Sequence, residues 1–102
     1  MTFRSQSLLA AIRECPCCVD YPHVCNEYDG VGPMHSNWLM WGKGKGLTCP
    51  DNFAAAGCNN AHRIIDPALG ATLPSEERET IWTKAYIKTQ TWLWENRRLK
   101  VA

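Results

Sequence analysis

The sequence predicts a small α+β domain in which a cysteine-rich metal-binding loop is followed by two short strands and a helix. Three observations lead to this fold class. The length of 102 residues suits one compact domain, which we place over residues 1–102. Six cysteines, four of them between residues 15 and 25, are candidate ligands for a metal ion that would stabilise a domain with a small hydrophobic core. A long helical pattern of apolar residues follows residue 75.

Composition narrows the classes of partner and compartment. The net charge of +1 argues against a globally basic nucleic-acid coat protein, although local basic patches remain. The start, Met1 to Ala11, lacks the long apolar run of a signal peptide, and no transmembrane stretch follows. We therefore expect a cytoplasmic protein without a membrane partner. Thiols stay reduced there, so clustered cysteines favour metal ligands over disulfides.

The first half of the chain predicts a short helix, a loop and a strand. Leu8, Leu9 and Ile12 form an apolar stripe, so we expect a capping helix over residues 5–13. Residues 14–32 are rich in cysteine, proline and glycine, which predicts a metal-organised loop. Gly32-Pro33 ends that loop in this interpretation, and the apolar run 34–40 is the first strand.

The middle of the chain predicts a second strand and a short helix. Residues 42–46 read Gly-Lys-Gly-Lys-Gly and predict a loop, and the apolar run 53–57 predicts the second strand. Asn59 and Asn60 then offer N-caps for a helix that ends at Ile65. The strand, strand and helix would follow one another directly in the chain.

The segment 75–98 gives the clearest helical signal. Ser75 is a suitable N-cap, two glutamates follow in the first turn, and two arginines close the last turn. We expect the aromatic stripe of this helix to pack into the core, with a nucleic-acid stacking surface as the alternative. The stripe consists of Ile81, Trp82, Ala85, Tyr86, Thr89, Trp92 and Leu93.

The cysteines indicate a zinc site shared by two segments. Zinc takes about four soft ligands in a tetrahedron, and ligands from separate segments clamp a short fold. The second segment lacks a second cysteine near Cys58. In the alternative interpretation some of the six cysteines, Cys49 above all, are buried thiols that bind no metal. The candidate ligands are Cys15, Cys17, Cys18 and Cys25 in the first segment and Cys58 in the second.

Two histidines suggest phosphodiester chemistry. Hydrolysis needs a base that activates water and a metal ion that stabilises charge on the phosphate. His35 in the first strand and His62 in the following helix would supply a base and a metal ligand if they faced each other. We expect His23 to be a hydrogen-bonded structural residue. Lys43 and Lys45 lie in the glycine-rich loop, which either contacts the DNA backbone or is a solubilising turn.

An ordered set of motifs resembles a known family. The set runs from Arg13 to Asp66, with a weaker similarity in the C-terminal helix. It resembles the small phage and prophage HNH-type nucleases (His-Me finger, ββα-metal fold) typified by YbcO, with the RecA-dependent phage nuclease Ref as a more distant relative. The motifs are Cys17 and Cys25-Asn26, then His35-Ser36-Asn37, Gly42 to Gly46, Asp51, Cys58 with His62, and Ile65-Asp66.

The resemblance implies a ββα-metal core with a structural zinc beside it, over residues 13–66, against which the helix over 75–98 packs. By this similarity His35 is the general base and His62 binds a catalytic Mg²⁺ or Mn²⁺ ion. The zinc ligands are Cys17, Cys25 and Cys58. The acidic positions are Asp51 and Asp66, and Asn37, Lys43 and Lys45 would contact DNA.

Two positions depart from the family pattern. The helix knuckle normally reads Cys-x-x-Cys-His, but Ala61 stands at the second cysteine position. Cys15 or Cys18 would fill the missing ligand position, and less readily Cys49 or His23. Many family members place an acidic metal ligand before the base, where this chain has Met34.

The sequence therefore predicts a metal-dependent DNA endonuclease of phage or prophage origin, in the host cytoplasm. A non-catalytic zinc module that binds DNA or a recombination protein is the first alternative, and a redox or metal-storage role for residues 15–18 is the second. A partnership with RecA would follow by analogy with Ref only.

Overall fold

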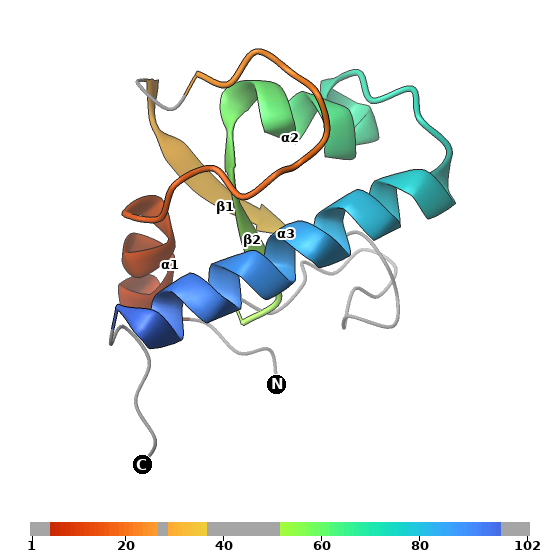
Figure 1. Ribbon diagram of the computed structural model, residues 1–102. Coiled ribbons are helices and arrows are strands. Elements are labelled where there is room, and N and C mark those ends of the chain that lie inside the picture. The colour runs from red at the N-terminus through yellow and green to blue at the C-terminus, as the bar shows by residue number, and fades with distance from the viewer. Residues whose placement is uncertain (1–4, 27–28, 37–51, 97–102) are drawn as a thin grey trace.

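The computed structural model describes residues 5–26, 29–36 and 52–96 of the chain. These residues form an α+β fold with a two-stranded antiparallel sheet, which confirms the predicted fold class. Figure 1 shows the long helix α3 running along one side of the sheet and of α2, with α1 near its C-terminal end. The elements are α1 (Gln6–Arg13), β1 (Val31–His35), β2 (Ala54–Cys58), α2 (Asn59–Ile65), the 3-10 helix η3 (Pro67–Leu69) and α3 (Ser75–Glu95).

Helix α1 begins where the sequence predicts it. The Oγ atom of Ser5 accepts a hydrogen bond from the backbone N–H of Leu8 at 3.2 Å, which satisfies one of the donors left open at a helix start. Ala11 and Ile12 are buried, and Leu8 packs at the margin of the core. The helix therefore closes one end of the sheet.

Strand β1 begins three residues earlier than predicted, so Pro33 lies inside the strand instead of ending the preceding loop. Pro33 pairs with Ala56 in the antiparallel register. The N–H of Ala56 donates to the hydroxyl of Thr89 at 2.9 Å, and its carbonyl accepts the N–H of Cys18 at 3.0 Å. Both groups of Ala56 therefore point away from β1. The missing N–H of proline therefore removes no bond between the strands.

Strand β2 is fully buried and made of small residues. It spans Ala54–Cys58, one residue later than predicted, and every residue in it is buried. A Cβ atom on Gly57 would lie 2.6 Å from the Sδ atom of Met34 and 3.3 Å from the Cβ of Ala61. The absence of side-chain bulk at Gly57 thus lets α2 lie close against the sheet.

Helix α2 follows β2 without a loop, and its N-cap differs from the prediction. Cys58 is the N-cap residue and makes no capping hydrogen bond with its side chain. The side-chain amide of Asn60 instead donates to the carbonyl of Val24 at 2.6 Å, and its backbone N–H donates to Oδ1 of Asn26 at 3.3 Å. The asparagine expected to cap the helix therefore anchors the cysteine-rich loop.

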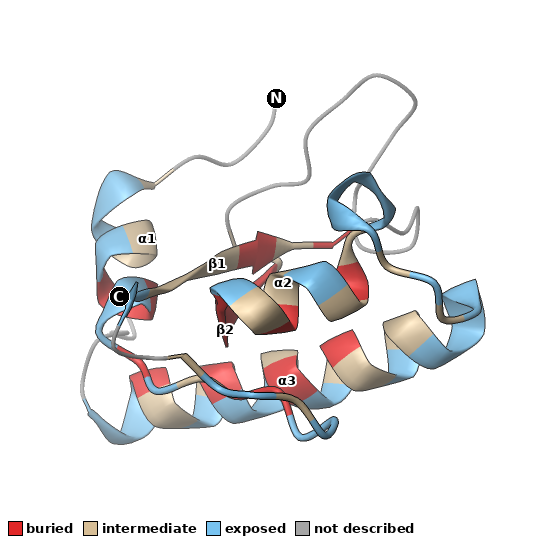
Figure 2. Cartoon of the chain, turned by 90° about the horizontal axis from the view of Figure 1, so that it is seen from above, coloured by how far each residue is buried: buried red, intermediate tan, exposed pale blue. Residues whose placement is uncertain are grey.

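The apolar stripe of α3 forms the centre of the core, as predicted. Trp82, Ala85, Thr89 and Leu93 are buried, and Figure 2 shows these buried positions recurring along the side of α3 that faces the sheet. The indole N–H of Trp82 donates to the carbonyl of Met34 at 2.9 Å. The alternative that the stripe is a nucleic-acid surface is wrong, because its members face inward.

Both ends of α3 differ from the prediction. The helix ends at Glu95 and not at residue 98, and Arg97 and Arg98 lie outside the described residues. Pro74 is the N-cap residue, and Ser75 is the first residue of the helix. Proline presets the backbone angle needed at a helix start and has no N–H to satisfy. The two glutamates of the first turn, Glu76 and Glu77, are present as expected. Among the described residues, no helix has the length and apolar character needed to cross a membrane.

The Thr89 hydroxyl is expected to be required for full stability. It accepts the N–H of Ala56 and donates to the carbonyl of Ala85 at 2.8 Å, both in the buried core. Thr89→Val keeps the shape but leaves the Ala56 N–H without its partner, so we expect a loss of about 1–3 kcal/mol in the free energy of unfolding. Thr91→Val is the matched control, because Thr91 is exposed and its hydroxyl donates locally to the carbonyl of Ile87 at 2.9 Å. Equal urea midpoints for the two variants would contradict this role.

Candidate metal centre

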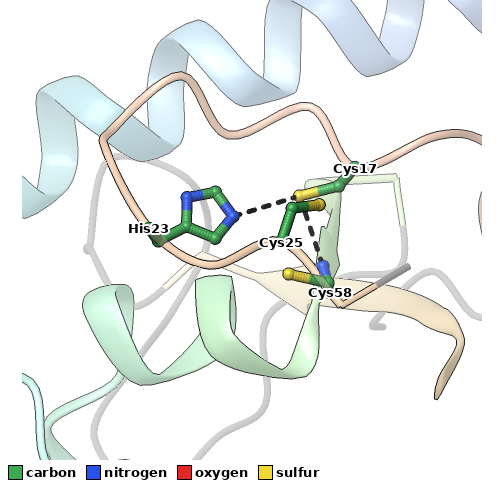
Figure 3. Close-up of side chains that lie close together, drawn as sticks. All are labelled: Cys17, His23, Cys25 and Cys58. Atoms are coloured by element: carbon green, nitrogen blue, oxygen red, sulfur yellow. Dashed lines mark hydrogen bonds between the residues drawn. The ribbon is translucent and has the colours of Figure 1, made fainter. Parts of the chain in front are cut away.

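Three cysteines and one histidine converge where the cysteine-rich loop crosses the junction of β2 and α2. Their ligand atoms, the sulfurs of Cys17, Cys25 and Cys58 and a ring nitrogen of His23, all lie within 4.8 Å of one another. Figure 3 shows the four side chains grouped above the first turn of α2. Three of them come from the loop, and Cys58 comes from the end of β2.

The chemistry of this donor set fits zinc. A tetrahedral zinc ion with ligand distances of about 2.3 Å has ligand–ligand distances of about 3.8 Å. The Cys17 Sγ and His23 Nε2 atoms are 3.8 Å apart. Three thiolates and one imidazole are a common set for a structural zinc site, and they fill all four positions. The four residues can therefore hold a metal ion of the structural type.

The tautomer of His23 suits metal binding. Its Nδ1 lies 2.5 Å from the backbone carbonyl of Tyr21, to which an Nδ1–H group donates. The proton is then on Nδ1, and Nε2 carries the lone pair that points toward Cys17 (Figure 3). Such a carbonyl partner is a recurrent feature of histidines that bind metals, because it fixes the ring.

Backbone contacts hold the cluster together from both segments. The N–H of Cys58 donates to the sulfur of Cys17 at 3.4 Å, which favours a negatively charged sulfur there. Asn60 binds Val24 and Asn26 on either side of Cys25, as described above. The hydrogen bond between Asn60 and Asn26 thus holds the cysteine-rich loop against the start of α2.

Hydrogen bonds to the sulfur of Cys58 change the pKa of this thiol. Desolvation acts to raise the pKa of this thiol, but hydrogen bonds, chiefly from the backbone N–H groups of Asn26 and Ala61, outweigh it. The result lowers the pKa of Cys58 to about 7. Desolvation raises the pKa of Cys17 and raises the pKa of Cys25 to about 12, so Cys58 is the ligand that loses its proton to zinc most readily.

Cys15 and Cys18 are outside the cluster, so the expectation that either is the fourth ligand is wrong. Both side chains are buried, and their sulfurs lie 3.6 Å from each other. The N–H of Cys18 bonds to β2, whereas Cys17, between them, is directed to the cluster. His23 lies at the fourth ligand position. The sequence analysis expected a structural role for it and named it only as a less ready candidate for this ligand. Cys49 lies outside the described residues.

His62 lies half-buried against β1, on the second turn of α2. A Cβ atom on Gly32 would lie 3.8 Å from His62 Nε2. Burial lowers the pKa of His62, while the backbones of Gly32 and Gly57 and the negative charge of Asp66 act to raise it. The neutral imidazole therefore stands beside a carboxylate one turn later in the chain. Among the described residues, no group of three metal-binding side chains forms around His62.

His35 ends β1 on the opposite side of the strand from the His62 contact. Side chains alternate along a strand, so His35 and Gly32 project from opposite faces, about 10 Å apart along the chain. Met34 shares the face of Gly32 and is buried there. The register therefore does not set His35 and His62 face to face as the sequence suggested.

The remaining candidate residues fall in two groups. Asp66 follows the end of α2, and its Oδ1 atom accepts a hydrogen bond from the backbone N–H of Ala68 at 2.9 Å. The predicted DNA contacts and one acidic position lie outside the described residues. They are Asn37, Lys43, Lys45 and Asp51.

Comparison of the chain with models of known protein families, with curated proteins and with solved structures finds no match.

His23 is expected to be essential for tight zinc binding. His23→Ala removes one of four ligands, so we expect zinc affinity to fall by more than about 100-fold, beyond the effect of losing an outer partner. His23→Cys should restore most of the affinity, because a thiolate suits the same position. Val24→Ala is the control, since Val24 is 79% exposed on the same loop. Competition with a chromophoric chelator measures the affinity, and unchanged binding by His23→Ala would exclude this ligand.

Proposed function

We propose that the chain is a zinc-stapled, metal-dependent DNA endonuclease of the HNH kind. The observation that carries the proposal is the placement of His62. A strand–strand–helix unit holds its neutral ring half-buried against β1, beside Asp66, and the four-ligand cluster fixes the junction from which that helix starts. This is the arrangement that the motif resemblance implies for a helix histidine that binds a divalent ion.

The residues of the chain suit separate parts of phosphodiester hydrolysis. His62, with Asp66, would hold a Mg²⁺ or Mn²⁺ ion, and that ion would supply charge neutralisation at the phosphate. His35 would accept a proton from the attacking water at one of its ring nitrogens. The structural zinc would take no part in the reaction, because its four ligand positions are filled by protein.

The register of β1 is compatible with this division of roles. In the family that the motifs resemble, the metal ligand and the base are often adjacent in sequence, so strand alternation sends them to opposite faces. Met34 stands at the ligand position, on the face of Gly32 and His62, and His35 stands at the base position. His35 and His62 would then act from opposite faces of β1.

One observation favours a second function, a non-catalytic zinc module that binds DNA or a protein of phage recombination. Met34 is buried, and its Sδ packs over Gly57, so the position of the acidic ligand is filled by an apolar side chain. A metal ion held by His62 and Asp66 alone would be bound more weakly than one that has a third protein ligand.

Cleavage assays separate the two functions. Zinc-loaded protein is incubated with plasmid DNA and with single- and double-stranded oligonucleotides, with Mg²⁺, with Mn²⁺ or with neither. We expect nicking only with an added divalent ion, and we expect His62→Gln to reduce it to a slow residual rate while the zinc content stays at one per chain. Persistent binding of DNA without any nicking, under all these conditions, would support the second function and contradict the first.

A further inference from the structure

Cys15 and Cys18 form a second pair of sulfurs that the zinc cluster does not use. They are spaced as Cys-x-x-Cys, and their Sγ atoms lie 3.6 Å apart. Both side chains are almost fully buried, with 2% and 7% of their surface exposed. Cys17 stands between them in sequence but belongs to the metal cluster. The loop therefore presents two distinct thiol groups on neighbouring residues.

The backbone fixes the pair from both sides. The N–H of Cys15 donates to the carbonyl of Ile12 at 3.0 Å, at the end of α1, and the N–H of Cys18 donates to Ala56 of β2 at 3.0 Å. Pro16, between the two cysteines, limits the backbone freedom of the segment. A disulfide requires sulfurs about 2.0 Å apart, so the two atoms need to approach by about 1.6 Å from their 3.6 Å separation. Rotation of the side chains supplies most of such a movement.

We propose that Cys15 and Cys18 are a redox-active dithiol, which a peroxide oxidises to an intramolecular disulfide before it oxidises the zinc ligands. One sulfur attacks the peroxide oxygen, the O–O bond breaks, and a sulfenic acid and one molecule of water or alcohol form. The second thiol attacks the sulfenic sulfur, which forms the S–S bond and releases a molecule of water. The two sulfurs lose two electrons and two protons in total, and the peroxide gains them.

The order of oxidation follows from the surroundings of the two groups. The sulfurs of Cys17, Cys25 and Cys58 share their lone pairs with the metal when zinc is bound, which lowers their nucleophilicity. The sulfurs of Cys15 and Cys18 have no place in that cluster, and each has a second thiol within contact distance to capture the sulfenic acid. The pair thus removes an oxidant that would otherwise release zinc. This inference does not depend on the nuclease proposal.

A peroxide titration tests the inference. Zinc-loaded protein carrying Cys49→Ser is treated with increasing hydrogen peroxide, and zinc release is followed with a chromophoric chelator. Thiols are alkylated before and after reduction with two isotopic forms of one reagent, and peptide mass spectrometry locates the bond. We expect the first oxidation product to have lost two hydrogen atoms, to carry its disulfide between Cys15 and Cys18, and to retain its zinc.

Two variants make the test decisive. Cys15→Ala and Cys18→Ala each remove one of the two thiols that this disulfide needs, and we expect both to release zinc at a lower peroxide dose than the parent protein does. Thermal melts before oxidation establish that each variant is folded, and either one alone suffices. Zinc release at the same dose in parent and variants, or a first disulfide that contains Cys17, Cys25 or Cys58, would overturn the inference.

Discussion

Removal of the metal ion by a strong chelator is expected to abolish the cooperative thermal unfolding of this protein. Structural zinc contributes an apparent binding free energy of about 10–16 kcal/mol in small zinc modules at neutral pH. Whole domains are stable by about 5–15 kcal/mol, so a contribution of this size decides whether the native state is populated. The four-ligand cluster joins the loop to the start of α2, and both should lose their structure without it.

The composition of the core is the reason why we expect the fold to depend on the metal. Strand β2 places three alanines and a glycine in the centre, and each alanine buries little apolar surface. Large side chains that are fully buried come mainly from helices, with Trp82 and Leu93 on α3 and Ile12 on α1. Hydrophobic burial around the loop is therefore too small to order it alone.

Adjacent cysteines provide matched variants for this prediction. Cys17→Ser removes a zinc ligand, whereas Cys18→Ala changes a buried sulfur outside the cluster. Circular dichroism should show a cooperative melt for the parent and for Cys18→Ala, and a broad, non-cooperative change for Cys17→Ser and for the chelated parent. A chelated protein that melts at the temperature of the zinc-loaded form would refute the dependence.

The sequence predicted the helices well because their signals are local. The stripe from Ile81 to Leu93 in α3 and the stripe of Leu8, Leu9 and Ile12 in α1 both follow the helical period. Strand β1 was harder, because Pro33 is typical of a loop and becomes acceptable only through its pairing with Ala56. The backbone of Ala56 bonds to Thr89 and Cys18 instead of to β1. These partners are distant in sequence, so no local sequence pattern predicts the bonds.

The zinc site was predicted except for its fourth ligand. Cys17, Cys25 and Cys58 stand at positions that the motif spacing marks, but Ala61 leaves the knuckle one ligand short. His23 supplies the missing donor from the loop, two residues before Cys25. A signal for this existed, since a knuckle that lacks one ligand directs attention to donors on the facing loop. Which donor reaches the metal depends on the backbone path through residues 18–25, which the spacing does not specify.

His35→Ala is expected to reduce DNA cleavage by about 10²–10⁴-fold, the usual contribution of a general base. The variant should keep its zinc and its melting temperature, because His35 lies at the end of β1, away from the zinc cluster. Imidazole added to the buffer should partly restore cleavage by His35→Ala, since it replaces the missing proton acceptor. It should not restore cleavage by His62→Gln, in which a metal ligand is lost.

Combining the two substitutions tests whether His35 and His62 serve one reaction across opposite faces of β1. Residues that act together in one catalytic step are strongly non-additive, so the second substitution changes little once the first has removed the step. We therefore expect His35→Ala with His62→Gln to cleave DNA about as slowly as the weaker single variant. Losses that multiply would instead mean that the two histidines act independently. Because His35 projects from the face of β1 opposite to Gly32 and its neighbour His62, that outcome would leave His62 as a structural histidine packed on Gly32.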